Sequence, residues 1–274
     1  MLTKARSFLS YLYYKKRWRH PINQFRIYAL SAFKSYAEPK TKFIVFAQGR
    51  TGSTLLIDLL NRSPEIHCDG EIFGASMPIR ILFPVWYKRG LIKLRKAPVY
   101  GYRIKIYDLT MFHSYRPEEA IDFMRSEFSA GWKIIFLNRK NKLRQAMSSL
   151  VAEARDQYHV KGLDHKKKGK DRVKVDAVSI PDRLKKLNAF SDWEQKALVG
   201  FDYLDINYEH DLLPNEKHQQ TLDRLTSYLG VGACIAESKL RRSSANDMAD
   251  YVLNYDEVLE ILKANDLMHY LEVQ

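Results

Sequence analysis

The chain has 274 residues, of which 46% are hydrophobic and 12% aromatic, and its formal net charge is +13 at pH 7. This length and apolar content allow one large hydrophobic core, and the excess of Lys and Arg favours an anionic partner such as a nucleotide, a glycan, a membrane face or nucleic acid. The two cysteines, Cys68 and Cys234, exclude a disulfide framework and a cysteine-rich zinc site. We therefore expect a reducing, cytoplasmic location. Since no apolar run approaches the roughly 20 residues of a membrane span, we expect neither a cleaved signal nor a transmembrane helix.

Residues 1–40 mix Tyr, Arg and Lys with apolar residues, and Pro21 and Pro39 interrupt them. This pattern predicts a basic helical N-terminal extension ahead of a single domain at residues 41–274. Packing of the extension on the edge of the domain is the simpler interpretation. Peripheral contact with a membrane through the basic residues is the alternative.

The order of the predicted elements indicates the fold class. The apolar, β-branched run at residues 42–47 predicts a strand buried on both faces, and a glycine loop and a leucine-rich helix follow it. Further strand candidates lie at residues 100–106, 133–138 and 203–207. Helical patterns lie between and after them at residues 117–128, 141–158, 181–198 and 214–229. This alternation predicts an α/β fold with a P-loop-like parallel sheet flanked by helices, and the basic residues 161–174 predict a mobile loop.

The glycine loop contains the residues Gln48, Gly49, Arg50, Thr51, Gly52, Ser53 and Thr54. A loop between a strand and a helix N-terminus offers backbone N–H groups and the positive helix end to an anion, which is usually a phosphate. A nucleoside-triphosphate loop would read G-x-x-x-x-G-K-[ST], but Ala47 stands at its first position and Ser53 at its lysine position. Arg50 instead offers a planar fork to phosphate oxygens. A glycine turn that only begins a helix is the alternative.

These residues resemble a known family. The sequence RTGSTLL at residues 50–56 resembles the 5′-phosphosulfate loop of sulfotransferases that use 3′-phosphoadenosine-5′-phosphosulfate (PAPS). The stretch NRSPE with the later Gly70-Glu71 resembles a segment of the trehalose, nodulation-factor and tyrosylprotein branches. The segment GYRIKIYD at residues 101–108 resembles the family's next strand, and the turn YEHDL at residues 208–212 resembles the family's Tyr-Glu-Asp-Leu turn. The resemblance covers about residues 42–261. It implies PAPS as the sulfuryl donor, bound by the glycine loop.

The same resemblance implies a second half of the donor site. Arg139 follows the strand candidate at residues 133–138, and Ser148 lies nine positions later on the next helix. In the family, an arginine and a serine at such places hold the 3′-phosphate. The spacing is one residue longer than in the cytosolic and tyrosylprotein enzymes, a departure that the trehalose-type branch tolerates. Ser148 is therefore preferred, and Ser149 is the alternative. The sequence LRRSS resembles the family's C-terminal loop near the 3′-phosphate and implies three further contacts: Arg241, Arg242 and Ser244.

The resemblance also implies how the transfer proceeds. Glu71 stands where related enzymes have a glutamate as general base, and His67 and Asp69 are the fallback candidates. Lys105 is the candidate cation for the charge that develops on the leaving group. We expect an in-line sulfuryl transfer without a metal. The expected acceptor is a hydroxyl on a glycan or glycolipid, with a tyrosine as second choice.

Two other functions are compatible with parts of the sequence. A kinase-like P-loop enzyme would share the fold class, but the loop lacks the required lysine. A basic nucleic-acid-binding protein could use residues 161–174 and the N-terminal extension. Since the sequence has neither a basic motif interleaved with aromatic residues nor helix-turn-helix spacing, we expect no nucleic-acid partner.

Overall fold

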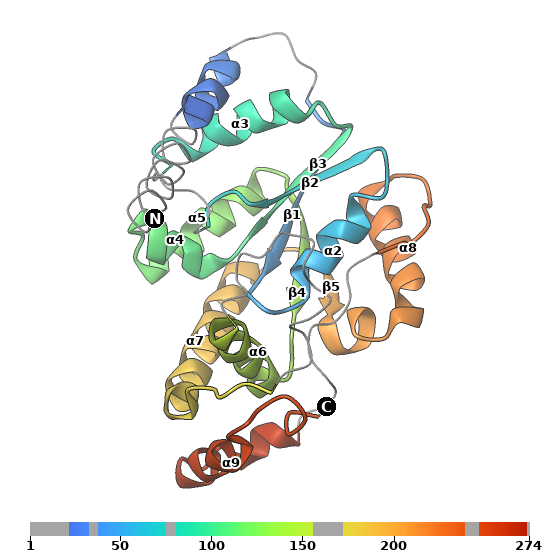
Figure 1. Ribbon diagram of the computed structural model, residues 1–274. Helices are drawn as coiled ribbons and strands as arrows, with labels where there is room; N and C mark the ends of the chain where they lie inside the picture. The colour runs from blue at the N-terminus through green and yellow to red at the C-terminus, as the bar shows by residue number, and fades with distance from the viewer. Residues whose placement is uncertain (1–21, 33–37, 75–80, 156–171, 239–246, 273–274) are drawn as a thin grey trace, which may run out of the picture.

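The computed structural model describes residues 22–32, 38–74, 81–155, 172–238 and 247–272. Within these ranges, five parallel strands form one sheet in the order β2-β3-β1-β4-β5 (Figure 1). The strands are β1 (Thr41–Ala47), β2 (Ile66–Glu71), β3 (Val99–Ile104), β4 (Lys133–Asn138) and β5 (Tyr203–Asn207). The prediction of an α/β fold with a parallel sheet flanked by helices is confirmed.

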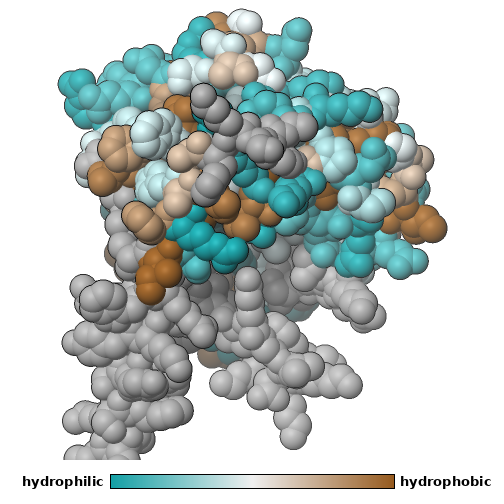
Figure 2. Space-filling model, turned by 90° about the horizontal axis from the view of Figure 1, so that it is seen from above, coloured by the Kyte–Doolittle hydropathy of each residue, from teal (hydrophilic) through white to brown (hydrophobic). Residues whose placement is uncertain are grey.

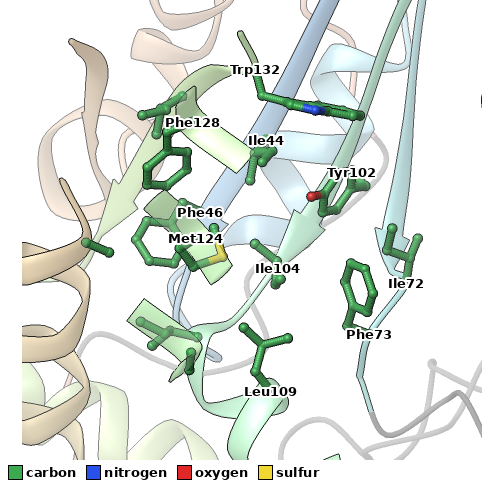
Figure 3. Packing of buried hydrophobic residues seen from close by; sticks show 14 of the residues in the cluster. Ile44, Phe46, Ile72, Phe73, Tyr102, Ile104, Leu109, Met124, Phe128 and Trp132 are labelled. Carbon is green, nitrogen blue, oxygen red and sulfur yellow. The ribbon is translucent and has the colours of Figure 1, made fainter. Parts of the chain in front are cut away.

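The central strand β1 is buried on both faces, and its side chains alternate between two hydrophobic clusters. Phe43 and Val45 pack in one cluster with leucines of α2 (Ser53–Leu60) and α8 (His218–Leu229). Ile44 and Phe46 pack in the other, with Met124, Phe128 and Trp132 (Figure 3). That second face is covered by α3 (Pro84–Arg95), α4 (Ile106–His113), α5 (Pro117–Ser129) and the end of α7 (Ile180–Leu198). The apolar run of the sequence is therefore a strand that is buried because helices cover both faces of the sheet.

A third hydrophobic cluster contains no residue of the sheet. It joins α6 (Lys142–Ala154), the first turns of α7 and α9 (Tyr255–Ala264). The helices predicted at residues 117–128, 141–158, 181–198 and 214–229 are α5, α6, α7 and α8, although α8 is preceded by a 3₁₀ turn at Asn215–Lys217.

Two parts of the sheet differ from the prediction. The strand expected at residues 100–106 ends at Ile104, because Lys105 is the N-cap of α4 and Asp108 lies in the first turn, where a carboxylate suits the helix dipole. The edge strand β2 has the sequence IHCDGE, which has no apolar run and was not predicted as a strand.

A helix at residues 22–32, hereafter the N-terminal helix, packs on α3. Gly90 permits the contact, because a Cβ atom there would lie 1.9 Å from the carbonyl oxygen of Ile27. The Lys93 Nζ atom donates a hydrogen bond of 2.9 Å to the carbonyl oxygen of Ser31. In the part of the chain that the structure describes, no helix has the length and apolar character needed to span a membrane.

Only the end of the predicted mobile loop at residues 161–174 is described, since residues 161–171 lie outside the described ranges. Val173 forms a parallel bridge with Val252. Its N–H group donates to the carbonyl oxygen of Tyr251 at 2.9 Å, and its own carbonyl oxygen accepts from Leu253 at 2.8 Å. The prediction of mobility is therefore wrong for Val173, because these backbone hydrogen bonds fix it to the C-terminal segment.

We predict that Gly101→Ala destabilises the protein by roughly 1–3 kcal/mol, the usual cost of overpacking a core. Gly101 pairs with Phe43 across β1 and β3, and a Cβ atom at Gly101 would lie 2.4 Å from the Phe43 ring. Urea unfolding measures the change. The matched control is Gly70→Ala, where a Cβ atom would meet nothing within 4 Å. An equal loss in both variants would contradict the packing argument.

Candidate functional site

The glycine loop and Arg139 meet at the carboxyl end of the sheet. The loop follows β1 and Arg139 follows β4, and the two strands are hydrogen-bonded neighbours with Ala47 opposite Leu137. From β1 the chain continues to β2 on one side of the sheet, and from β4 it continues to β5 on the other. Such a change of direction opens a crevice in which parallel α/β sheets bind ligands.

The glycine loop is held in a strained conformation. Gly52 has a φ of 83°, and a Cβ atom there would lie 2.6 Å from the ring of Tyr208, so both conformation and space require glycine. Arg50 also has a positive φ, of 63°. The Thr51 hydroxyl donates to the carbonyl oxygen of Gln48 at 2.8 Å. Since Gly52 is the N-cap of α2 and no side chain caps this helix, its first turn is open to an anion in the loop.

The predicted donor residues of the two strands contact one another. The Arg50 Nε atom donates to the Ser148 hydroxyl at 3.0 Å, and the Arg139 Nη1 atom donates to the carbonyl oxygen of Arg50 at 2.9 Å. The Ser149 hydroxyl instead donates to Glu153 on its own helix, at 3.5 Å. The structure thus places Ser148, rather than Ser149, at the loop. The predicted contacts Arg241, Arg242 and Ser244 lie outside the described residues.

Arg139 is positioned by the turn that follows β5. Its guanidinium lies 4.5 Å from the centre of the Tyr208 ring, and its Nε atom lies 3.7 Å from Glu209. The Glu209 carboxylate also accepts hydrogen bonds of 3.1 Å from the backbone N–H groups of Lys140 and Asn141. The sequence motif at this turn did not indicate a role, and the structure shows that the turn fixes the end of β4.

A β-bulge at Gly70 directs Glu71 toward the loop. Asp69 lies opposite Tyr102 of β3, whereas Glu71 lies opposite Arg103, so Gly70 is an extra residue in β2. A bulge reverses the side to which the next residue points. One oxygen of the Glu71 carboxylate therefore lies 2.7 Å from Arg103 Nη2 and 2.8 Å from Lys105 Nζ.

The two alternative bases, Asp69 and His67, interact with residues outside the glycine loop. Asp69 lies 2.6 Å from Arg95 of α3, and it accepts a hydrogen bond of 3.0 Å from the Tyr100 hydroxyl. The His67 Nε2 atom lies 3.1 Å from Asp69. Burial alone would raise the pKa of Asp69. The hydrogen bonds with His67 and Arg95 outweigh burial, and the pKa of Asp69 lies below its usual value. This environment makes Asp69 a poor proton acceptor.

Arg103 links Glu71 to the glycine loop, a connection that the sequence analysis missed. Besides its contact with Glu71, its Nη1 atom donates to the Ser53 hydroxyl at 2.7 Å and to the Thr54 hydroxyl at 3.3 Å. The sequence does contain a pattern that indicates this role, because Arg103 and Lys105 alternate at the end of a predicted strand and alternate residues of a strand point to the same face. Arg103 thus fixes the candidate base relative to the first turn of α2.

A second carboxyl group, Asp108, lies behind Lys105. It is only 1% exposed, and its Oδ2 atom has no hydrogen-bond partner among the described residues, although Lys105 Nζ lies 3.9 Å away. A Cβ atom at Gly74 would lie 2.7 Å from Glu71 Oε2 and 3.0 Å from Asp108 Oδ2, so only glycine leaves room for both carboxyl groups. The pKa of Asp108 is raised to about 7. Burial is the main cause, the negative charge of Glu71 adds to it, and the positive charge of Lys105 opposes it. Lys105 is therefore shared between a surface-accessible and a buried carboxyl group.

The opposite side of the loop contains another buried carboxyl group, Glu194 of α7. Its Oε2 atom accepts a hydrogen bond of 2.8 Å from Gln48. Burial raises the pKa of Glu194 above its usual value, because this effect outweighs the lowering effects of Gln48 and Lys142. A cavity of about 270 Å³ next to it is lined by residues that include Gln48, Arg139 and Glu194. Among the described residues, no group of three or more His, Cys, Asp or Glu side chains is arranged to hold a metal ion.

Comparisons with known proteins identify the fold. Neither a scan against protein-family models nor a search of curated proteins finds a match. The structure is similar to that of a sulfotransferase from Alicyclobacillus acidocaldarius, with a TM-score of 0.50 and 14% identity over 84% of this chain and 96% of that chain. Mouse sulfotransferase SULT7A1, in a complex with PAP, has a TM-score of 0.34 and 14% identity over 88% of this chain and 69% of that chain. The likeness to the bacterial protein shows that this chain has a sulfotransferase fold.

We predict that Asp108→Asn raises the melting temperature more at pH 8 than at pH 5. The pKa of Asp108 is raised to about 7 in the folded state, so the folded protein holds a proton that the unfolded chain releases near pH 4. Wild-type stability therefore falls as pH rises from about 4 to 7, and an amide cannot ionise. Thermal unfolding across this pH range measures the difference. A difference between variant and wild type that is independent of pH would contradict the assignment.

Proposed function

We propose that the protein is a PAPS-dependent sulfotransferase that transfers a sulfuryl group to a hydroxyl of a carbohydrate. The observation that carries the proposal is the meeting of Arg50, Ser148 and Arg139 at the crevice between β1 and β4. A donor with phosphate groups at both its 5′ and 3′ positions needs two anion sites on one surface. A loop arginine beside a second arginine and a serine offers both.

The donor has a natural orientation in this crevice. Its 5′-phosphosulfate would lie in the glycine loop at the open first turn of α2, where backbone N–H groups and Arg50 bind oxygens. Its 3′-phosphate would lie between Arg139 and Ser148, which offer a planar fork and a hydroxyl. No step assigned to the donor needs the lysine of a triphosphate loop. The sequence motif and the contacts therefore support PAPS better than ATP.

The transfer exchanges one sulfur–oxygen bond for another. The acceptor oxygen attacks sulfur in line, the bond from sulfur to the 5′-phosphate oxygen breaks, and the hydroxyl proton leaves to a base. Glu71 is the base in this proposal, since Arg103 and Lys105 fix its carboxylate beside the loop. Lys105 and the loop stabilise the charge on the departing phosphate oxygen.

The acceptor in this proposal is a hydroxyl on a glycan or glycolipid, and a tyrosine hydroxyl is the second choice. The carbohydrate assignment is supported by the resemblance of NRSPE and Gly70-Glu71 to the trehalose and nodulation-factor branches, and their resemblance to the tyrosylprotein branch makes tyrosine the second choice. The base has the same task for either acceptor, because both present an O–H group to the sulfur.

We predict that adenosine 3′,5′-bisphosphate binds at least about tenfold more tightly than 5′-AMP, because hydrogen bonds to a charged phosphate contribute about 1.5–3 kcal/mol. Ser148→Ala should weaken the bisphosphate selectively and leave 5′-AMP nearly unchanged. The matched control is Ser149→Ala, whose hydroxyl bonds Glu153. Isothermal titration calorimetry measures the affinities. Equal affinities of the wild-type protein for the two nucleotides would refute the 3′-phosphate site.

We predict that Glu71→Gln retains donor binding while turnover falls by about 10²- to 10⁴-fold, the usual contribution of a general base. Glutamine keeps the shape of the side chain but accepts no proton. Sulfuryl transfer to a carbohydrate acceptor, or reverse transfer from an aryl sulfate, measures turnover, and titration with adenosine 3′,5′-bisphosphate measures binding. Glu119→Gln is the control, because this carboxylate is ion-paired with Arg116 at the start of α5 and lines no part of the site. Near-normal turnover of Glu71→Gln would remove Glu71 as the base.

A further inference from the structure

Large hydrophobic side chains are exposed on the N-terminal helix and at the start of α3. We call these residues the apolar patch: Ile22, Phe25, Leu82, Phe83, Val85 and Trp86, which are 57–75% exposed. The Phe83 and Trp86 rings lie 5.7 Å apart, and Tyr28 of the N-terminal helix lies 6.1 Å from Phe83, so the two helices contribute to one surface. Figure 2 views the end of the molecule where these helices lie in Figure 1, and hydrophobic residues there reach the surface among hydrophilic ones.

The two helices themselves contribute only positive charge, and their acidic neighbours are Asp69, which is ion-paired with Arg95, and Glu38, which interacts electrostatically with Lys93. The N-terminal helix and α3 contain no Asp or Glu, and the sequence has none between Glu71 and Asp108. The exposed cations of the two helices and of the α3 C-cap are Arg26, Arg89, Arg95 and Lys96. Residues 1–21, which precede the N-terminal helix, add six Lys and Arg and no acidic residue. Exposed aromatic side chains on helices whose own charged residues are all cations fit the headgroup region of an anionic lipid bilayer.

A pocket of about 420 Å³ opens between these two helices and the end of β2. Its walls combine aliphatic side chains of Ile27, Leu91 and Leu94 with polar groups of Asn23, Gln24 and Arg26, and they include Glu71. A ligand that matches such walls has both apolar and hydroxyl-bearing parts. The pocket is thus built on the two helices that carry the apolar patch, and it extends to the candidate base.

We propose that the apolar patch docks on an anionic membrane surface and that the pocket beside it receives the sugar hydroxyl of a membrane glycolipid. The proposal of membrane docking depends only on the exposure of the apolar patch and on the positive charge of the two helices. The acceptor half rests on the proposed function, because it needs Glu71 as the base. A docked orientation would bring the lipid headgroup to the pocket without extraction of the acyl chains, since the patch and the pocket share both helices.

The test of docking uses the full chain and vesicles of phosphatidylcholine, with or without phosphatidylserine. In cosedimentation, we expect binding to the vesicles that contain phosphatidylserine, weaker binding in higher salt and little binding to phosphatidylcholine alone. The double variant Phe83→Ser/Trp86→Ser should reduce the partition coefficient at least about tenfold. The matched control Val178→Ser/Val199→Ser changes two residues that are 71% and 66% exposed elsewhere and should bind like wild type.

The outcomes separate docking from the proposed function. Absence of wild-type binding to vesicles with phosphatidylserine, or an equal loss in both double variants, overturns the docking proposal. A concentration-dependent dimer that Phe83→Ser/Trp86→Ser abolishes in sedimentation velocity also overturns it, because a second copy would then cover the patch. Titration with adenosine 3′,5′-bisphosphate tests the donor site separately, and we expect the same affinity in wild type and in both double variants, which also shows that they are folded.

Discussion

The hydrogen bond from Arg139 to the carbonyl oxygen of Arg50 is the contact on which the site depends. It joins the ends of β1 and β4, and it stabilises a loop in which Arg50 has a left-handed backbone. Arg139 can make it because Tyr208 and Glu209 hold its guanidinium from the other side. The guanidinium of Arg139 is thereby fixed against the backbone of the loop that carries Arg50.

Glu71 and Lys105 are connected to the same loop through a chain of charged residues. Arg103 connects the hydroxyls of α2 to Glu71, and Lys105 connects Glu71 to the buried Asp108. Protonation of Asp108 removes one of the two carboxylates that compete for Lys105. We therefore expect the position of Lys105 to change with pH near neutrality.

The sequence predicted the parts of the site that are encoded locally. The strand, loop and helix around Arg50 follow one another without interruption, and Arg139 directly follows an apolar run, so periodicity was sufficient. Other parts depend on residues that are distant in the sequence. The strand β2 contains polar residues that are buried only because Arg95, Tyr100 and Arg103 lie beside it. Helix α3 was not predicted, because its lysines interrupt the apolar pattern of a buried helix. Lys88 can be buried only because it forms an ion pair with Glu127 of α5, which is distant in the sequence.

The most direct test of the account is transfer of label from [³⁵S]PAPS by the purified full chain. The acceptors are glycolipids in vesicles, free oligosaccharides and tyrosine peptides, and release of adenosine 3′,5′-bisphosphate is followed in the same reactions. The account predicts that labelled sulfate appears on a carbohydrate in equal amount to the bisphosphate released, and that neither ATP nor magnesium is required. Failure of the protein to bind PAPS, combined with hydrolysis of ATP in the presence of magnesium, would contradict it.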